Sequence, residues 1–375
     1  MIKLREMIQM ADNDKIVAEK KEENRYYKWL ASMIIPVLAV ITGLLVGAIF
    51  MLAIGRDPVQ AYIVLFNSAF GSLNGFAETL VNTTPLIFTG LAVAFAFRTG
   101  LFNIGGDGQF LIGYIASTWL GFFFQLPLFI HLPLALLGGM VAAGLWGGFA
   151  GLLKAKLGVH EVITTIMMNY IALYLVSYLT GGPLKASGFM PATPKIADTA
   201  KLMRLLPFGR LNAGFIVALV AAYIVYYILW RTTLGYEIRA VGLNPDAAEY
   251  GGIKAARNMI LAMFISGCLA GLAGVTQSLG LEFRAYQPFG FIGYGFTGIA
   301  VALLGKNHPA GVVLGAFLFG ILQRGSMLMQ SIAGVPKEVI EIIQAIIILF
   351  VAAEYLFTLL SNRIKKYRKE TSDVN

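Results

Sequence analysis

The sequence predicts an all-α membrane protein with many spanning helices. Of the 375 residues, 58% are hydrophobic and only 13% are charged, and the mean hydropathy is +0.74. This composition offers too little polar surface for a water-soluble globule of the same length. Many segments also reach the roughly 20 apolar residues that a helix needs to cross a bilayer core. The sequence shows none of the short segments of alternating polarity that would indicate transmembrane strands.

The apolar segments predict about ten transmembrane helices. The first segment is too long for a removable signal peptide and lacks a small-residue cleavage site, so we expect it to remain as a span. Most Lys and Arg residues fall on the inner side when both termini are cytoplasmic, which agrees with the positive-inside rule. The predicted ranges are 29–54, 81–97, 109–127, 132–153, 159–180, 211–230, 257–280, 290–304, 310–330 and 338–361.

One membrane domain is therefore expected between two cytoplasmic tails. The domain covers 29–361, and the tails are 1–28 and 362–375. The net charge of +9 is concentrated at the ends of the spans, which indicates membrane topology and no nucleic-acid partner. Cys268 is the single cysteine, so the chain forms no intrachain disulfide.

Two segments are expected at the outer surface. Residues 57–80 begin with Asp57 and Pro58, a suitable cap and first helical residue, and their mixed polarity predicts a helix lying along the membrane. Residues 181–210 are rich in Gly, Pro and Lys and predict the largest external loop.

Non-helical backbone is expected inside the membrane at 97–109. The segment RTGLFNIGGDGQ, 98–109, is rich in glycine and polar residues. Such backbone is tolerated at membrane depth only where it is buried in protein or lines a wet cavity, and broken elements of this kind often mark a transport route. The short predicted spans 81–97 and 290–304 are the other weak points of the helical pattern.

Glycines spaced four residues apart recur in the predicted spans. Small residues at this spacing allow helix backbones to approach closely, so we expect a tightly packed bundle. The pairs are Gly43 and Gly47, Gly144 and Gly148, Gly267 and Gly271, and Gly311 and Gly315.

The residue patterns of catalytic sites are missing. AVALLGKN, 300–307, comes nearest to a phosphate-binding loop, but it has Ala300 where the loop needs glycine and Asn307 where it needs Ser or Thr. The three histidines are scattered and no Cys/His cluster is present, which argues against a metal site or an intramembrane enzyme. Arg324 and Glu354 lie inside predicted spans and leave open a second function, an ion-coupled secondary transporter of a small polar solute.

A polar segment, YEIRAVGLNPDAAEYGGI, separates the sixth and seventh predicted spans within the loop 231–257. Asn244 is a good N-cap, and Pro245 fits the first helical position, where its missing N–H costs nothing. Asp246 suits the positive end of the helix dipole, and Gly251 can take the left-handed position after the helix. The sequence thus predicts a short cytoplasmic helix at 245–250. Such a helix can transmit motion from a soluble partner, or it can merely connect two spans.

Several of these blocks resemble a known family. LGYEIRAVGLNPDAAEYGGI, 234–253, is similar to the cytoplasmic coupling loop of ATP-binding-cassette (ABC) importer permeases in the branched-chain amino acid, ribose and nucleoside group. TPLIFTGLAVAFAFRTGLFNIGGDGQFLIG, 84–113, resembles a second block, with Asp107 in place of the more usual glutamate. DPVQAYIVLFNSAFGS, 57–72, resembles the nucleoside and simple-sugar branch, which includes guanosine and purine nucleoside permeases. With FGFIGYGFTGIAVALLGKNHPAG, 289–311, the resemblance runs from about residue 30 to about residue 360.

The resemblance implies a type II ABC-importer-like permease bundle in a bacterial cytoplasmic membrane. The chain would form one half of a dimeric channel, with a related permease or a second copy as the other half. A separate ATPase subunit would use ATP and Mg²⁺, an external substrate-binding lipoprotein would dock on loops such as 181–210, and nucleosides or related sugar compounds would be carried. The chain itself would hold no cofactor and no catalytic residue.

A membrane protein with a structural role and no cargo is a third hypothesis, which would leave the capped cytoplasmic helix unexplained.

Two groups of candidate site residues follow. By resemblance, the residues that would couple to the ATPase are Arg239, Gly242, Leu243, Asn244, Pro245, Asp246, Ala247, Ala248, Gly251 and Gly252. Polar residues at broken or glycine-rich elements are candidates for the substrate pathway, and each could equally make a hydrogen bond between helices. They are Asn82, Asn103, Asp107, Gln109, Asn169 and Gln277.

Overall fold

The computed structural model describes residues 36–207, 209–351 and 353, and these residues form helices joined by loops. The only β-structure among them is two isolated bridges, Ala192 with Tyr286 and Arg204 with Asn212. The predicted tails 1–28 and 362–375, and Glu354, lie outside the described residues. The described chain divides into two compact units, 55–340 and a smaller one built from 36–54 and 341–353.

The smaller unit pairs the helix Pro36–Ala53 with the described part of the last helix. A Cβ on Gly43 would lie 2.7 Å from the Ile347 side chain and 3.1 Å from the Ile343 carbonyl oxygen. The absence of a side chain at Gly43 therefore lets these two helices pack closely, as the glycine spacing predicted.

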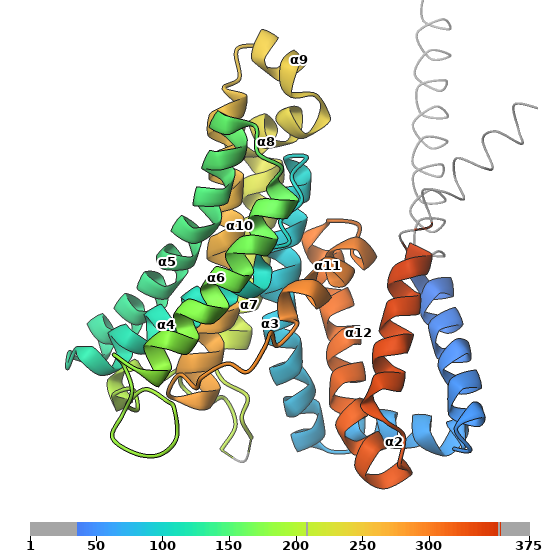
Figure 1. The fold of residues 1–375 in the computed structure, drawn as a ribbon. Coiled ribbons are helices and arrows are strands. Elements are labelled where there is room, and N and C mark those ends of the chain that lie inside the picture. The colour runs from blue at the N-terminus through green and yellow to red at the C-terminus, as the bar shows by residue number, and fades with distance from the viewer. Residues whose placement is uncertain (1–35, 208, 352, 354–375) are drawn as a thin grey trace, which may run out of the picture. The chain divides into compact units, whose positions relative to one another are not determined.

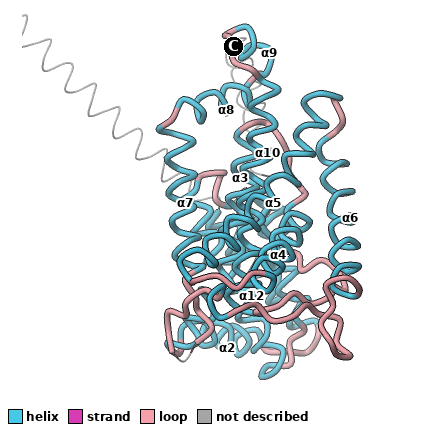
Figure 2. The backbone as a smooth tube through the Cα atoms, turned by 90° about the vertical axis from the view of Figure 1, so that its left-hand side faces the viewer, coloured by secondary structure: helices cyan, strands magenta, loops and turns pink. Residues whose placement is uncertain are grey.

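The larger unit contains eleven α-helices (Figure 1). The long ones form a bundle, with α2 at one end and with α8 and α9 at the other (Figures 1 and 2). We call these the α2 end and the α9 end. The helices are α2 Pro58–Phe70, α3 Leu73–Arg98, α4 Gly106–Phe123, α5 Leu128–Leu157, α6 Glu161–Gly181, α7 Gly214–Arg231, α8 Thr233–Leu243, α9 Pro245–Tyr250, α10 Ala255–Gln277, α11 Tyr294–Leu304 and α12 Pro309–Leu328, with short 3₁₀ and π segments at Asp198–Ala200, Ser278–Glu282 and Met329–Ala333.

Within the described residues, seven helices are long and apolar enough to cross a membrane. They are Pro36–Ala53, α3, α5, α6, α7, and α10 and α12 with the π-helical turns that follow them. The predicted spans 109–127 and 290–304 correspond to α4, which opens with a polar turn, and to α11, which has only 11 residues. The helical nature of the protein is confirmed, whereas ten crossings and cytoplasmic termini stay predictions.

The boundary between α2 and α3 differs from the sequence prediction. Asp57 caps α2 as expected, because its carboxylate accepts a hydrogen bond from the Val59 N–H (2.8 Å). The surface helix predicted over 57–80 was too long, however, since α2 ends at Phe70. Ser72 then caps a new helix by accepting from the Gly75 N–H (2.9 Å). The span predicted at 81–97 therefore starts at Leu73 and is a full-length helix.

Helices α3 and α10 form the core of the larger unit and run in opposite directions. They are the two most buried of the seven span candidates. Helix α3 runs from the α2 end, where Gly75 contacts Ser68, to the α9 end, where Arg98 contacts Gly242. Helix α10 starts beside α9, where Ala255 packs with Ala248, and so points the other way. Helices α11 and α12 pack on α3, and α4 and α5 pack on α10.

Each core helix is followed by a segment that turns back into the bundle and leads into another helix. After α3, the non-helical residues 99–105 return into the bundle, where Leu101 and Asn103 are buried. Helix α4 then runs beside the second half of α10, with Gly113 against Gly271. After α10, residues 283–293 lead into α11, which runs beside the second half of α3. The non-helical backbone predicted near 97–109 is thereby confirmed at 99–105.

A long irregular segment, 182–213, covers the α2 end and matches the predicted external loop 181–210 within a few residues. Its backbone is fastened to the segment after α10, for example by Thr193 N–H to Ala285 O (2.9 Å) and Leu202 N–H to Leu279 O (2.9 Å). This loop is therefore a cover that backbone hydrogen bonds hold against the end of α10 and the segment after it.

Candidate functional site

The α9 end carries two short helices in sequence. Asn244 caps α9 by accepting from the Ala247 N–H (3.1 Å), and Pro245 occupies the first turn, so the predicted helix at 245–250 is confirmed. The left-handed residue is Gly252, with φ of +84°, and not Gly251, whose φ is −76°, so that assignment was wrong by one position. Gly251 instead continues the last helical turn through its N–H bond to Ala247 O (3.1 Å).

Helix α8 was missed by the sequence analysis. Thr232 caps it by accepting from the Gly235 N–H (3.2 Å), and Gly235, Ile238 and Val241 form its buried face. A Thr cap followed by small or apolar residues at every third position was the signal that could have revealed it. Together α8 and α9 form a helix pair between α7 and α10, which we call the α8–α9 pair.

The predicted coupling residues divide into an exposed tip and a packed base. Leu243 is 90% exposed, and the other exposed members are Asn244, Pro245, Asp246, Ala247, Gly251 and Gly252. Tyr250, which was not among the predicted residues, lies beside them and is 99% exposed. Ala248 is buried against Val241 and Ala255, and Arg239 is half-buried with its Nε bonded to Gly235 O (3.3 Å). Two large apolar side chains thus project from the tip, which is the property of a docking surface.

The base of the α8–α9 pair lies in backbone contact with the end of α3. A Cβ on Gly242 would come 2.2 Å from Arg98 O, so no side chain fits there without displacing backbone. On the other side of the contact, Gly100 has φ of +75°, and its Cβ position lies 3.3 Å from Gly242 O. These two glycines allow α8 to rest directly on the turn that ends α3.

Arg98 connects this contact to the turn between α11 and α12. Its guanidinium donates to Asn307 O from Nε (3.1 Å) and from a terminal nitrogen (3.0 Å), and it lies 5.2 Å from the Trp230 ring centroid. Lys306 and Asn307 both adopt left-handed φ values, +53° and +52°, which are unfavourable for residues with side chains. The arginine therefore holds a strained turn in place and ties together the ends of α3, α7 and α11.

His308 belongs to the same cluster, at the start of α12. Its ring lies 5.0 Å from that of Trp230 and 5.9 Å from that of Tyr226. Burial lowers the pKa of His308, and the positive charge of Arg98 lowers it further. The imidazole therefore stays neutral near pH 7 and adds no second charge beside the arginine.

Asn103 and Gln109 are hydrogen-bonded to each other at the break between α3 and α4. The Asn103 amide donates to Gln109 Oε1 (2.9 Å) and to Ser266 Oγ on α10 (2.8 Å). In return Gln109 donates to Asn103 Oδ1 (3.1 Å), and that oxygen also accepts from the Gly105 N–H (2.9 Å). Both side chains are only 1% exposed. Asn103 thereby satisfies the Gly105 N–H within the break, and its bonds with Gln109 keep both buried amides paired.

Asn169 and Asp107 fix the first turn of α4 from two sides. Asn169 of α6 accepts from the Gly108 N–H (2.8 Å) and donates to Ile104 O (3.0 Å). Asp107 accepts from the Gly295 N–H (3.1 Å) and the Phe296 N–H (3.3 Å) at the start of α11. Four of the six predicted pathway residues thus meet at one buried junction, where they make hydrogen bonds between helices.

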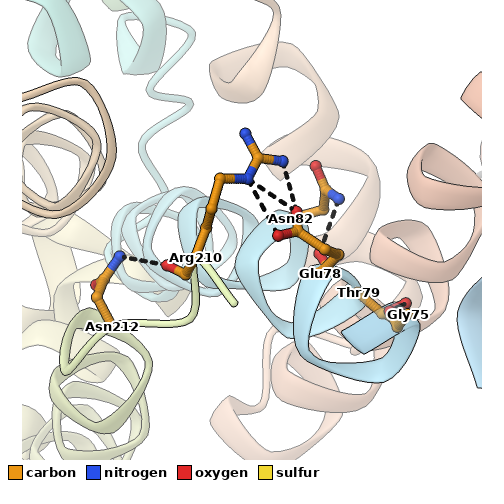
Figure 3. Close-up of polar contacts among 6 residues, drawn as sticks. All are labelled: Gly75, Glu78, Thr79, Asn82, Arg210 and Asn212. Carbon is orange, nitrogen blue, oxygen red and sulfur yellow. Dashed lines mark hydrogen bonds and ion pairs between the residues drawn. The ribbon is translucent and has the colours of Figure 1, made fainter. Parts of the chain in front are cut away.

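The other two candidates lie nearer the α2 end. Asn82 is half-buried and donates to Glu78 O one turn earlier in α3 (2.9 Å), as Figure 3 shows. Gln277 lines a small cavity between α3, α10 and the segment before α7. The cavity is lined by Val81, Thr84, Pro85, Leu211, Asn212, Thr276, Gln277 and Leu281.

A charged pair missed by the sequence analysis lies beside Asn82. Glu78 is 8% exposed at its side chain and binds Arg210, a residue of the 182–213 cover (Figure 3). The Arg210 Nε donates to both carboxylate oxygens at 3.1 Å, and a terminal nitrogen donates to Oε2 at 2.5 Å. The carboxylate was overlooked because the sequence placed Glu78 outside a span.

Among the described residues, no group of three or more His, Cys, Asp and Glu side chains could hold a metal ion.

The family profile and the similar proteins all describe transporter permeases. The sequence profile described as "Branched-chain amino acid transport system / permease component" matches residues 75–352. The guanosine ABC transporter permease protein NupP of Bacillus subtilis is 46% identical over 90% of this chain and 98% of its own length. The nucleoside ABC transporter permease protein NupB of Lactococcus lactis is 40% identical over 89% and 94%. A glucose ABC transporter permease protein of Haloferax volcanii is 37% identical over 89% and 88%.

Proposed function

This chain belongs to the family of branched-chain amino acid transport system permease components, and from that membership we propose that it carries nucleosides into the cell. It is a multi-pass permease subunit of an ABC importer in the cytoplasmic membrane. The proposed cargo rests on the guanosine and nucleoside permeases that are 46% and 40% identical to nearly the whole chain.

A separate ATPase subunit supplies the energy in this proposal, since the sequence lacks a phosphate-binding loop. ATP and Mg²⁺ would act there and not on this chain. The observation that supports its docking site is the α8–α9 pair, whose exposed tip carries Leu243 at the end of α8 and Tyr250 at the end of the short, well-capped α9. On this assignment the α9 end is cytoplasmic and the α2 end faces outward, with both termini inside and ten crossings.

Movement of the α8–α9 pair would reach the membrane core through Gly242 and Arg98. The pair rests on the end of α3 without intervening side chains, so a displacement there is transmitted by contact of backbones. Arg98, which is hydrogen-bonded to Asn307 O, would then transmit this displacement to the turn before α12. Because packed elements move between discrete arrangements, such a push would switch the bundle between inward and outward access as a rigid body.

Two further partners complete the proposed importer. A second permease, either a related chain or a copy, would form the other half of the pathway. An external substrate-binding lipoprotein would dock on the ordered cover 182–213 at the α2 end. In this arrangement Asn103, Asp107, Gln109 and Asn169 shape the pathway by holding the junction of α4 and α11, whereas Asn82 and Gln277 lie where a solute could contact them.

Uptake of labelled guanosine into proteoliposomes tests the function. The complete importer, reconstituted with its ATPase and its loaded receptor, is expected to accumulate guanosine only when ATP is present on the ATPase side. An ion-coupled secondary transporter would instead accumulate a solute under a proton or sodium gradient without the ATPase. ATP-independent accumulation by this chain would contradict the proposal, and uptake of glucose in preference to guanosine would contradict the cargo.

A further inference from the structure

The end of α10 combines several unusual features around one carboxylate. Residues Ser278–Glu282 form a π-helical turn, and Phe283 directly after it has a left-handed φ of +57°. π-helical turns and left-handed residues with side chains are both unfavourable and concentrate at functional sites. Glu282 lies at this point, as the last residue of a membrane-span candidate.

Two side chains position the Glu282 carboxylate. Gln277, one turn earlier, donates from Nε2 to Glu282 Oε1 (2.6 Å). The Tyr114 hydroxyl of α4 bonds Glu282 Oε2, and this hydroxyl accepts from the Tyr286 N–H (2.9 Å). Tyr114 is only 5% exposed, whereas Glu282 is partly exposed. The carboxylate is therefore held at both oxygens, and the residue as a whole keeps some solvent exposure.

The same carboxylate is adjacent to the cavity described above. Gln277 forms part of the cavity wall and bonds Glu282, so the carboxylate lies one side chain behind that wall. Thr84, Asn212 and Thr276 add further polar groups from three elements. The cavity has room for about one water molecule in this conformation. A larger solute would therefore enter only when α3, α10 and the cover 182–213 separate.

A fixed carboxylate beside a carboxamide suits a particular kind of ligand. The carboxylate accepts two hydrogen bonds from neighbouring hydroxyl groups, and hydrogen bonds to a charged acceptor are the stronger kind. Nucleosides and simple sugars share a ring with adjacent hydroxyl groups. We infer that Glu282, positioned by Tyr114 and Gln277, binds adjacent hydroxyl groups of the sugar ring as the solute passes. This inference rests on the proposed function and assigns the residue that recognises the ribose part of the cargo.

The test compares two nucleosides in the complete importer. The transport rate into proteoliposomes is measured at saturating receptor loaded with guanosine or with 2′,3′-dideoxyguanosine, which lacks both ring hydroxyls. Glu282→Gln is expected to lower the guanosine rate about tenfold, the equivalent of one lost charged hydrogen bond. The dideoxyguanosine rate is expected to stay the same, because this nucleoside makes no such bond. Glu338→Gln, at an exposed glutamate, is the matched control.

Each other outcome has a distinct meaning. Equal loss for both nucleosides would show that Glu282 only braces the segment after α10, and no loss for either would show that it does not contact cargo; both overturn the inference. If Glu282→Gln is not recovered as a monodisperse protein, Glu282→Asp, which keeps the charge and withdraws it by one methylene, must show the same selective loss. If the wild-type importer carries glucose and no nucleoside, the proposed cargo fails, and Glu282→Gln must then lower glucose transport for the inference to stand.

Discussion

The Asp107 carboxylate of α4 accepts a hydrogen bond from the backbone N–H of Gly295 in α11 (3.1 Å), which joins the starts of these two helices. The backbones also touch here, because a Cβ on Gly106 would lie 2.9 Å from Gly295 Cα. The positive ends of two helix dipoles therefore meet inside the bundle. Asp107 places its carboxyl oxygens between them and satisfies two N–H groups of α11 that have no partner within their own helix.

Replacing Asp107 by alanine is expected to destabilise the protein by about 2 kcal/mol, since two buried N–H groups would lose their acceptor. Asp107→Asn keeps one acceptor oxygen and should cost less. Thermal unfolding of the purified protein in detergent measures both. Asp198→Ala, at an exposed carboxylate of the cover, serves as control and should leave the melting temperature unchanged. Equal melting temperatures for Asp107→Ala and the wild type would show that the junction is held by packing alone.

Gly242→Ala is expected to uncouple ATP hydrolysis from transport. The added methyl group would meet Arg98 O at 2.2 Å and displace α8 from the end of α3. A change in coupling of about 1 to 2 kcal/mol is typical of substitutions along such a connection. The measurement is the number of guanosine molecules imported per ATP hydrolysed. Gly181→Ala is the matched control, because its Cβ would meet nothing nearer than 3.8 Å, and an equal loss in both variants would count against the proposed route.

Arg98→Lys is expected to weaken the same connection although the charge is kept. Lysine offers a point charge in place of the planar guanidinium, which reaches Asn307 O with two nitrogens. We expect a loss of about 1 to 2 kcal/mol in unfolding free energy and a lower transport-to-ATP ratio. Arg231→Lys, at the exposed last residue of α7, should change neither quantity. Unaltered coupling in Arg98→Lys would show that the turn before α12 does not carry the motion.

The features that the sequence predicted correctly are those determined within a few residues. The bounds of α9 follow from Asn244 and Pro245, and the break after α3 follows from the glycine and polar residues of 98–109. The missed features depend on partners far apart in the chain. Asp107 and Gly295 are 188 residues apart, and Glu78 and Arg210 are 132 apart, so no local pattern could pair them.

Local misreadings have a different cause. The surface helix was extended through 57–80 because the Ser72 cap was not recognised, and this also shortened α3 and hid Glu78. In the same way, the sequence alone does not distinguish two roles for the amide side chains near the break, contact with a solute and hydrogen bonding to another helix. The structure distinguishes these two roles, because Asn103 and Gln109 are buried and hydrogen-bonded to each other.

The Glu78–Arg210 pair should couple the cover 182–213 to α3. Removal of Arg210 would leave a mostly buried carboxylate without its partner, whereas Glu78→Gln removes the charge itself. A double-mutant cycle with Glu78→Gln and Arg210→Gln is therefore expected to give an interaction energy of about 1 kcal/mol, a value reduced because the Arg210 side chain is 62% exposed. Additive effects in thermal unfolding would show that the pair contributes nothing.

The cap of α9 gives the most direct test of the docking surface. Asn244→Ala removes the side-chain acceptor for the Ala247 N–H and should cost the helix about 1 kcal/mol. A helix of 6 residues cannot offset such a loss by its own length, so α9 would fray while the bundle remains folded.

The expected result for Asn244→Ala is an unchanged melting temperature and weaker binding of the ATPase subunit, measured by titration of the purified permease. Asn244→Ser retains a capping oxygen and should recover most of that binding. Equal loss in the alanine and serine variants would mean that the ATPase contacts the Asn244 amide itself and that the order of α9 is not what matters. Full binding in both would place the docking surface elsewhere, because the exposed Tyr250 is presented by this helix.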